Sequence, residues 1–199
     1  MKKFFFGLMF TFLFIGLQAQ DTTKNTTTDS IPVVVVVADT AVKTTTAKNN
    51  ELPNIELKDL NGNRINIKSL GDSGKITIIT FWATWCKPCI KELNNTLDFI
   101  DDWKTKYNVQ YFAVSVDDAK TTNSVRPLAT ALNYDWNYHI LLDPNRDLAR
   151  TMNVNNPPMI FIYDVSGNLV YTHMGYTEGG EYEVNDKVLE LNGIVKKKK

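Results

Sequence analysis

The stretch that decides the fold spans residues 76–92 and reads ITIITFWATWCKPCIKE. It opens with seven β-branched or aromatic residues, 76–82, a run typical of a buried strand. A three-residue turn leads to Cys86 and Cys89, and an apolar pattern of helical period begins at Ile90. A Cys-x-x-Cys pair between a strand and a helix is the setting of a redox dithiol.

The two cysteines are expected to have different roles, because they lie at different depths in the helix. Pro88 suits a first helical turn, since its φ is near the helical value and it has no N–H to lose. Cys86 then lies at the helix N-terminus, where free N–H groups and the helix dipole stabilise a thiolate. Lys87 adds a positive charge beside it. We predict that Cys86 attacks the disulfide of a partner. Cys89, which is buried one turn deeper, is expected to resolve the mixed disulfide that forms.

Two other interpretations of the cysteine pair are weaker. A structural disulfide that closes so short a loop would stabilise the fold little by chain entropy. A zinc site needs about four ligands, and the sequence has neither a second Cys-x-x-Cys nor a His pair. We therefore expect a redox-active Cys86–Cys89 disulfide, no metal site and no bound cofactor.

Residues 81–89, FWATWCKPC, resemble the active site of thioredoxin-like proteins. With Glu92, the Trp-Cys-x-Pro-Cys-x-x-Glu pattern is similar to that of the extracytoplasmic TlpA/ResA-like branch. The resemblance covers about residues 51–195. It implies an α/β thioredoxin fold in which helices flank a central mixed sheet, with an N-terminal β-hairpin and an inserted strand–helix unit.

The rest of the chain agrees with this fold. Alternating residues around Asn61-Gly62-Asn63 predict the hairpin, and Asp117 and Asp118 are expected to cap the segment after them. Pro127 predicts a helix start or a kink. The other expected elements are a helix after Cys89 with Ile90, Leu93, Leu97, Ile100 and Trp103 on one face, strands 110–116 and 139–142, helices around 125–132 and 148–152, a hairpin 159–163 and 169–174, and a last helix with Val188, Leu189 and Leu191.

The first twenty residues have the pattern of a secretory signal. Lys2 and Lys3 precede an apolar run, 4–17, that is short for a membrane span. We expect cleavage near Ala19 and export to the periplasm or cell envelope. The alternative is an uncleaved signal that anchors the protein, and membrane contact is expected only in that case. Because no cysteine lies near the predicted cleavage site, lipidation of a new N-terminal cysteine is excluded.

The rest of the sequence predicts the boundaries of the linker, the folded domain and the C-terminal tail. Residues 21–50 are rich in Thr and predict a disordered linker, within which the role of the run Val33–Val37 stays open. Residues 51–195 form the thioredoxin-like domain, and residues 196–199 are a basic tail. The formal net charge is +0, which argues against a nucleic-acid partner.

Glu92 is the candidate proton acceptor. It lies three residues after Cys89, on the same side of the helix and at the edge of the apolar face. Partial desolvation there would raise its pKa and suit it to take a proton from Cys89. The resemblance lends Glu92 the same role, whereas the alternative is a surface glutamate. Thioredoxin has a buried aspartate where this chain has Thr80, so Glu92 is the acid we expect nearby.

Residues that support the dithiol follow from the resemblance. Thioredoxin-like proteins have a cis-proline facing the dithiol, and the register gives Pro158, with Pro157 as the alternative. In such proteins the residue before the cis-proline usually offers both its N–H and its C=O to a substrate strand. Here that residue is Pro157, which has no N–H. Trp85 is expected on an exposed docking rim, and Trp82 in the core. His139 and His173 are isolated and expected to be structural.

These features predict an exported thiol–disulfide oxidoreductase. It would act on protein disulfide substrates, reducing envelope proteins such as apocytochrome c, with electrons from a membrane thiol donor. The alternatives are a disulfide-donating oxidase of the same fold and a copper-binding thioredoxin-like chaperone, although such chaperones use a wider cysteine spacing. Peroxiredoxins use Thr-x-x-Cys, and residue 83 here is Ala, which disfavours a peroxidase.

Overall fold

The computed structural model describes residues 51–194. The predicted signal, 1–20, the linker, 21–50, and the tail, 196–199, lie outside the described residues. The described part is built on a mixed sheet flanked by helices, which is the architecture that the sequence predicts.

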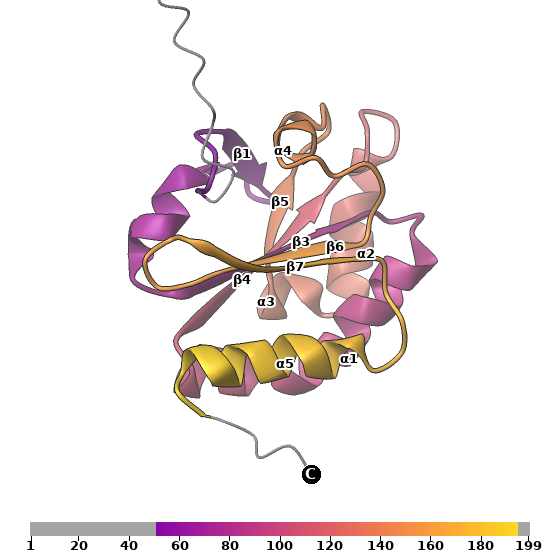
Figure 1. Cartoon of the computed structure of the whole chain (residues 1–199). Coiled ribbons are helices and arrows are strands. Elements are labelled where there is room, and N and C mark those ends of the chain that lie inside the picture. Colours follow the sequence, from indigo (N-terminus) through magenta and orange to yellow (C-terminus); the bar gives the residue numbers. More distant parts are fainter. Residues whose placement is uncertain (1–50, 195–199) are drawn as a thin grey trace, which may run out of the picture. The chain divides into compact units, whose positions relative to one another are not determined.

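Seven strands form this sheet in the order β2-β1-β5-β4-β3-β6-β7 (Figure 1). The parallel pairs are β3 with β4 and β4 with β5, and the other neighbours are antiparallel. The strands are β1 (Glu56–Asp59), β2 (Arg64–Asn66), β3 (Ile76–Trp82), β4 (Val109–Ser115), β5 (His139–Leu142), β6 (Met159–Tyr163) and β7 (Leu169–Met174).

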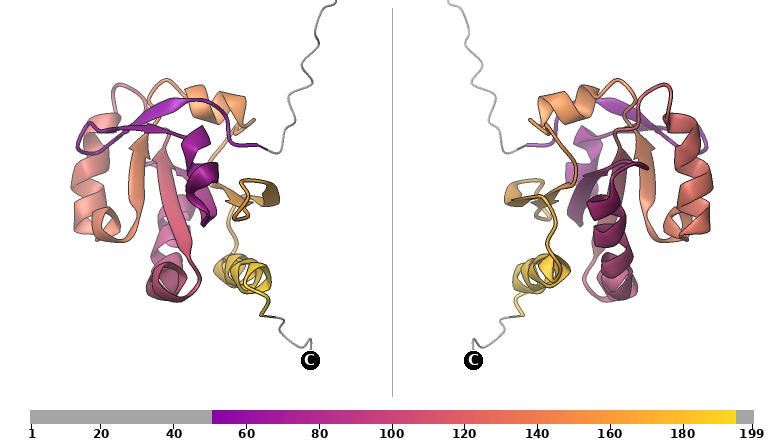
Figure 2. Two further views of the ribbon diagram at one scale, coloured as in Figure 1. Left: turned by 90° about the vertical axis from the view of Figure 1, so that its left-hand side faces the viewer. Right: turned by 90° about the vertical axis from the view of Figure 1, so that its right-hand side faces the viewer.

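The helices lie on the two faces of the sheet. Figures 1 and 2 show α1 and α5 side by side on one face and α4 on the other. The α-helices are α1 (Lys87–Lys106), α2 (Val125–Ala131), α3 (Tyr134–Asn137), α4 (Asp147–Thr151) and α5 (Gly180–Leu191), and the 3₁₀ helices are η1 (Lys68–Ser73) and η2 (Thr122–Ser124). None of the helices within residues 51–194 is both long and apolar enough to cross a membrane.

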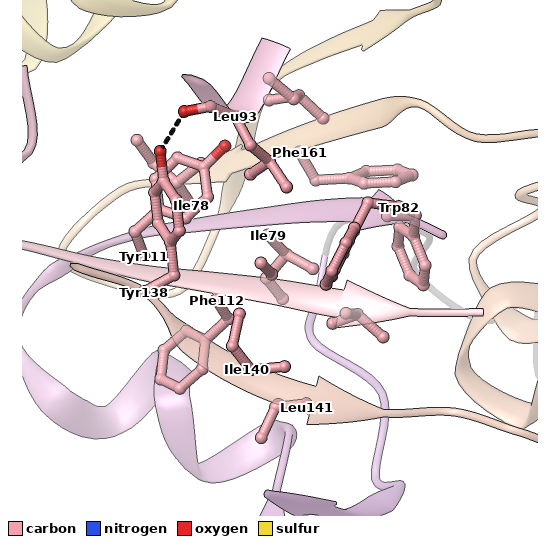
Figure 3. Packing of buried hydrophobic residues seen from close by; sticks show 14 of the residues in the cluster. Ile78, Ile79, Trp82, Leu93, Tyr111, Phe112, Tyr138, Ile140, Leu141 and Phe161 are labelled. Atoms are coloured by element: carbon pink, nitrogen blue, oxygen red, sulfur yellow. Dashed lines mark hydrogen bonds between the residues drawn. The ribbon is translucent and has the colours of Figure 1, made fainter. Parts of the chain in front are cut away.

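The central strand β3 is buried along its whole length. Because side chains alternate along a strand, it supplies apolar groups to both faces of the sheet. Figure 3 shows Ile78, Ile79 and Trp82 of β3 packed among side chains from β4, β5, β6 and α1. The burial of both faces explains why residues 76–82 form a continuous run of β-branched and aromatic residues and do not alternate with charged ones.

Tyrosines near α3 hold α1 against the sheet. The hydroxyl of Tyr134 donates to the backbone carbonyl of Ile90 at 3.0 Å, and that of Tyr138 donates to the carbonyl of Leu93 at 2.5 Å (Figure 3). These contacts place α3 on the same side of the sheet as α1. The N-terminal part of the helix that carries the cysteines is therefore fixed at two carbonyls, one turn apart.

Differences from the sequence prediction are small and local. The helix α1 begins at Lys87, before Cys89, and Pro127 lies in the first turn of α2, where a start was expected. The short helix α3 was not predicted, because four residues carry too little periodicity. Of the expected apolar face of α1, the residues Leu93, Ile100 and Trp103 are fully buried.

Gly167→Ala should lose more stability than Gly62→Ala. Both glycines have positive φ, +76° and +85°, so each alanine incurs a backbone penalty of about 1 kcal/mol. A Cβ at Gly167 would also lie 3.1 Å from the Cα of Gly71 in η1, whereas one at Gly62 meets nothing within 4 Å. Chemical denaturation checks this order, and equal losses would contradict the close approach of the β6–β7 turn to η1.

Candidate active site

The two cysteines are joined as a disulfide at the start of α1. Cys86 is the N-cap residue, and its Sγ accepts a hydrogen bond from the backbone N–H of Cys89 at 3.3 Å. The exposed fraction is 5% for Cys86 and 0% for Cys89. The sulfur of Cys86 thus lies where the helix N-terminus can stabilise a thiolate, while Cys89 is closed off from solvent.

The turn before Cys86 is held by Asp117, which follows β4. Its carboxylate accepts from the backbone N–H of Thr84 at 2.8 Å and from the Thr84 hydroxyl at 2.6 Å. Ser115 donates to the same carboxylate at 2.9 Å. The expectation that Asp117 caps the segment after it is therefore wrong, because the neighbouring strand end places the Thr84 donors within reach. Asp118 alone binds the following turn, at the N–H groups of residues 120 and 121.

The cis peptide bond lies between Pro157 and Pro158, so Pro158 is the cis residue and the alternative register does not hold. The carbonyl oxygen of Pro157 is 3.8 Å from Sγ of Cys86. On the other side, the carbonyl of Pro158 accepts from the N–H of Gly175 at 2.9 Å. The loop before β6 therefore faces the exposed edge of the disulfide.

Glu92 is buried more completely than the sequence analysis expected, with an exposed fraction of 3%. Its carboxyl oxygen accepts from the hydroxyl of Thr80 in β3 at 3.0 Å. Burial raises the pKa of Glu92 to about 8; the Thr80 hydrogen bond opposes the rise, and the charge of Glu181 adds to it. A carboxyl group in this state can both give and take a proton near neutral pH.

Glu181 is a second buried acid near the site. It lies in the first turn of α5 and has an exposed fraction of 7%. Glu181 was not among the residues predicted from the sequence, which pointed to Glu92 alone. The position of Glu181 in a first helical turn is common for a glutamate. The local sequence does not show which other helix the side chain faces, so it could not identify Glu181 as a site residue.

The surroundings of the disulfide combine exposed apolar and charged groups. Trp85 is 58% exposed, as expected for a rim residue, whereas Trp82 is fully buried. Lys87 and Pro88 are also exposed. Met174, which was not predicted, is 66% exposed and pairs across β6 and β7 with Met159, next to Pro158. The sequence offered one signal for Met174, because it ends the hairpin strand that was expected to pair beside the cis-proline.

The histidines lie elsewhere. His139 stacks on Phe112 with ring centroids 4.9 Å apart, and His173 stacks on Tyr171. Within residues 51–194, no three side chains of His, Cys, Asp or Glu gather in a way that could hold a metal ion.

Comparisons with known proteins identify the family and support the fold. Residues 49–172 match the AhpC/TSA family. Thiol-disulfide oxidoreductase ResA of Bacillus subtilis is 30% identical over 132 residues, 65% of this chain and 69% of that protein. Thioredoxin-like protein YneN of the same species is 33% identical over 135 residues, 67% of this chain and 75% of that protein. A thioredoxin-like protein from Porphyromonas gingivalis is 44% identical with a TM-score of 0.61, over 70% of this chain and 90% of that chain.

The stability of the oxidised protein should fall as the pH rises from about 4.5 to about 8. In that window the folded state keeps the Glu92 proton that the unfolded chain, with the ordinary pKa of 4.5, has released. Each unit of pKa difference corresponds to about 1.4 kcal/mol, so the loss amounts to a few kcal/mol. Glu92→Gln should remove most of this loss in denaturation curves recorded without reductant.

The exposed Glu183→Gln is the matched control, and it should keep the pH dependence of the wild type. If Glu92→Gln and the wild type lose stability in parallel between pH 5 and pH 9, the raised pKa of Glu92 is contradicted.

Proposed function

This chain belongs to the AhpC/TSA family and is a thiol–disulfide oxidoreductase of the ResA type, and we propose that Cys86 and Cys89 are its redox-active pair with Glu92 as the proton carrier. The observation that supports these roles is the contrast between the two sulfurs. Cys86 caps the helix beside the cis-proline loop, whereas Cys89 is closed off and lies one turn from a buried acid.

The reaction begins with the reduced protein. The Cys86 thiolate attacks one sulfur of a partner disulfide, and the other partner sulfur leaves as a thiolate. The Glu92 carboxylate takes the proton of the Cys89 thiol. The Cys89 thiolate then attacks Sγ of Cys86, which forms the intramolecular disulfide and releases the second partner thiolate. Two electrons have passed to the partner, and Glu92 holds a proton.

Regeneration is the reverse exchange with a thiol donor. A donor thiolate attacks Sγ of Cys86, and Cys89 leaves as a thiolate that receives the proton from Glu92. A second donor thiolate then attacks the donor sulfur of this mixed disulfide, which oxidises the donor pair and releases the Cys86 thiolate. A pKa of about 8 for Glu92 in the disulfide form suits this step, because the group is mostly protonated at neutral pH. We infer that the donor is a membrane thiol protein and that no bound cofactor takes part.

Export and the direction of electron flow are also part of the proposal. The signal-like pattern of residues 1–20 supports a place in the periplasm or cell envelope. There the protein would reduce disulfides of envelope proteins, for example in cytochrome c maturation. The exposed cation Lys87 favours the opposite direction, donation of disulfides, because it stabilises the reduced thiolate form.

Partner docking would use the rim around Cys86. Trp85 and Met174 offer exposed apolar surface, and Met174 pairs with Met159, the residue after Pro158. A partner strand that crosses this loop would bring its disulfide to the edge of Cys86. Pro157 can offer only its carbonyl oxygen to such a strand, so we infer weaker or more selective docking.

The reduction potential of the Cys86–Cys89 pair tests the function and its direction. Equilibration against a dithiothreitol or glutathione series should give a value near or below the ~−270 mV of thioredoxin if the protein is a reductase. A value nearer ~−120 mV would make it a disulfide donor. Failure to titrate would contradict the proposed redox pair, and Cys86→Ser and Cys89→Ser serve as controls that cannot form the disulfide.

Pro157→Thr should speed exchange with partner proteins. The new N–H can donate one main-chain hydrogen bond to the docked strand, and a bond of ordinary strength corresponds to about a two- to tenfold gain in kcat/KM. Stopped-flow Trp fluorescence with several disulfide peptides measures the rate. Asn156→Thr is the control, since that exposed residue already has its N–H. No gain with any partner would contradict the docking model.

A further inference from the structure

A half-buried polar cluster joins α1 to the start of α5. Its centre is the carboxylate of Glu181, whose Oε2 accepts from the hydroxyl of Tyr176 at 2.8 Å and from the N–H of Gly179 at 3.1 Å. Asn95 of α1 donates to the Tyr176 hydroxyl at 2.6 Å and lies 3.5 Å from Oε1 of Glu181. The carboxylate is thus held in place by neutral donors from two segments, α1 and the loop before α5.

This arrangement leaves the charge of Glu181 without a cation. Among the ion pairs within residues 51–194, none includes Glu181. Lys91 is the cation of α1 on this side, and it pairs instead with the exposed Glu178 at 2.8 Å. Hydrogen bonds from Tyr176, Gly179 and Asn95 and the N-terminus of α5 stabilise this carboxylate in place of a cation.

The cluster lies one helical turn from the proposed proton carrier. Asn95 follows Glu92 by three residues, so the two side chains project from the same side of α1. The negative charge of Glu181 raises the pKa of Glu92 beyond the larger effect of burial. Proton transfer from a thiol of pKa ~8.5 to a carboxylate of ordinary pKa, ~4.3, is unfavourable. Raising the pKa of the carboxyl group brings the two pKa values closer together and makes the transfer easier.

Other titratable groups face Glu92 but carry no charge near pH 8. Three tyrosines interact with Glu92: Tyr111 in β4, Tyr138 directly after α3, and Tyr171 in β7. Burial is the main cause of the raised pKa of each. Burial raises the pKa of Tyr176 to about 12. Cys89 is in the disulfide. Glu181 is therefore the anion that acts on Glu92.

We propose that Glu181 is a positioning residue for the redox reaction, which fixes a negative charge beside Glu92 so that the proton passes readily between Glu92 and Cys89 in both directions. The inference rests on the proposed role of Glu92. No atom of Glu181 takes part in the exchange, and its effect is electrostatic. The hydrogen bonds from Tyr176 and Gly179 keep the carboxylate turned inward.

Glu181→Gln removes the charge while keeping an oxygen that can accept from Tyr176 and Gly179. In the oxidised full-length protein with ¹³C-labelled glutamate, the NMR titration midpoint of the Glu92 carboxyl should be near 8 in the wild type and lower in Glu181→Gln. The signal is assigned by its loss in Glu92→Gln. Glu183→Gln makes the same charge change at an exposed position of α5 and should leave the midpoint unchanged.

A midpoint that stays at the wild-type value in Glu181→Gln would overturn the proposal. Tyr176→Phe supplies a second variant should Glu181→Gln fold poorly. Without the tyrosine hydroxyl the carboxylate of Glu181 can turn toward solvent, so the Glu92 midpoint should again fall. An unchanged midpoint in this folded variant would also count against the role of Glu181.

Kinetics separate this inference from the proposed function. The rate of reduction of the Cys86–Cys89 disulfide by dithiothreitol, followed against pH, should shift to lower pH in Glu181→Gln in step with the NMR midpoint. A merely structural role would lower the rate at every pH without moving the profile. If the midpoint shifts but the rate profile of Glu92→Gln matches the wild type, the role of Glu92 fails while the electrostatic coupling to Glu181 stands.

Discussion

The burial of one carboxyl group beside the inner cysteine is the constraint on which the site depends. The buried side chain of Glu92, in α1, accepts a hydrogen bond from Thr80 of β3, and its charged form is poorly solvated there. The resulting pKa of about 8 allows a carboxylic acid to exchange protons with a thiol. The same group in water would be ionised at neutral pH and would hold no proton for Cys89.

The scaffold keeps this arrangement rigid from several directions. Hydroxyl groups of Tyr134 and Tyr138 hold the carbonyls of α1 on its sheet-facing side, and the carboxylate of Asp117 fixes the turn at Thr84. The cis-proline loop closes the outer side of Cys86. Because each contact comes from a different element, the dithiol is positioned by the whole sheet and not by its own helix alone.

Sequence analysis succeeded where the signals are local. The strands β5, β6 and β7 have the predicted bounds, since short apolar runs between turn residues define them. It failed at Asp117, whose partner Thr84 lies on the neighbouring strand end, and at Glu181, whose surroundings depend on how α5 packs. A carboxylate with a long-range partner has the same local pattern as a capping or surface residue.

Local residue patterns determine the strand, turn and helix that carry Cys86 and Cys89, because strand propensity, Pro88 and the apolar period act over a few residues. The succession of elements along the chain follows from the same patterns. The cis-proline was expected from the family resemblance, which left Pro157 and Pro158 as alternatives, and the structure assigns it to Pro158. Only the tertiary structure decided the chemistry of Glu92. Its pKa depends on desolvation by the packed core and on the charge of Glu181, and both arise when segments distant in sequence come together.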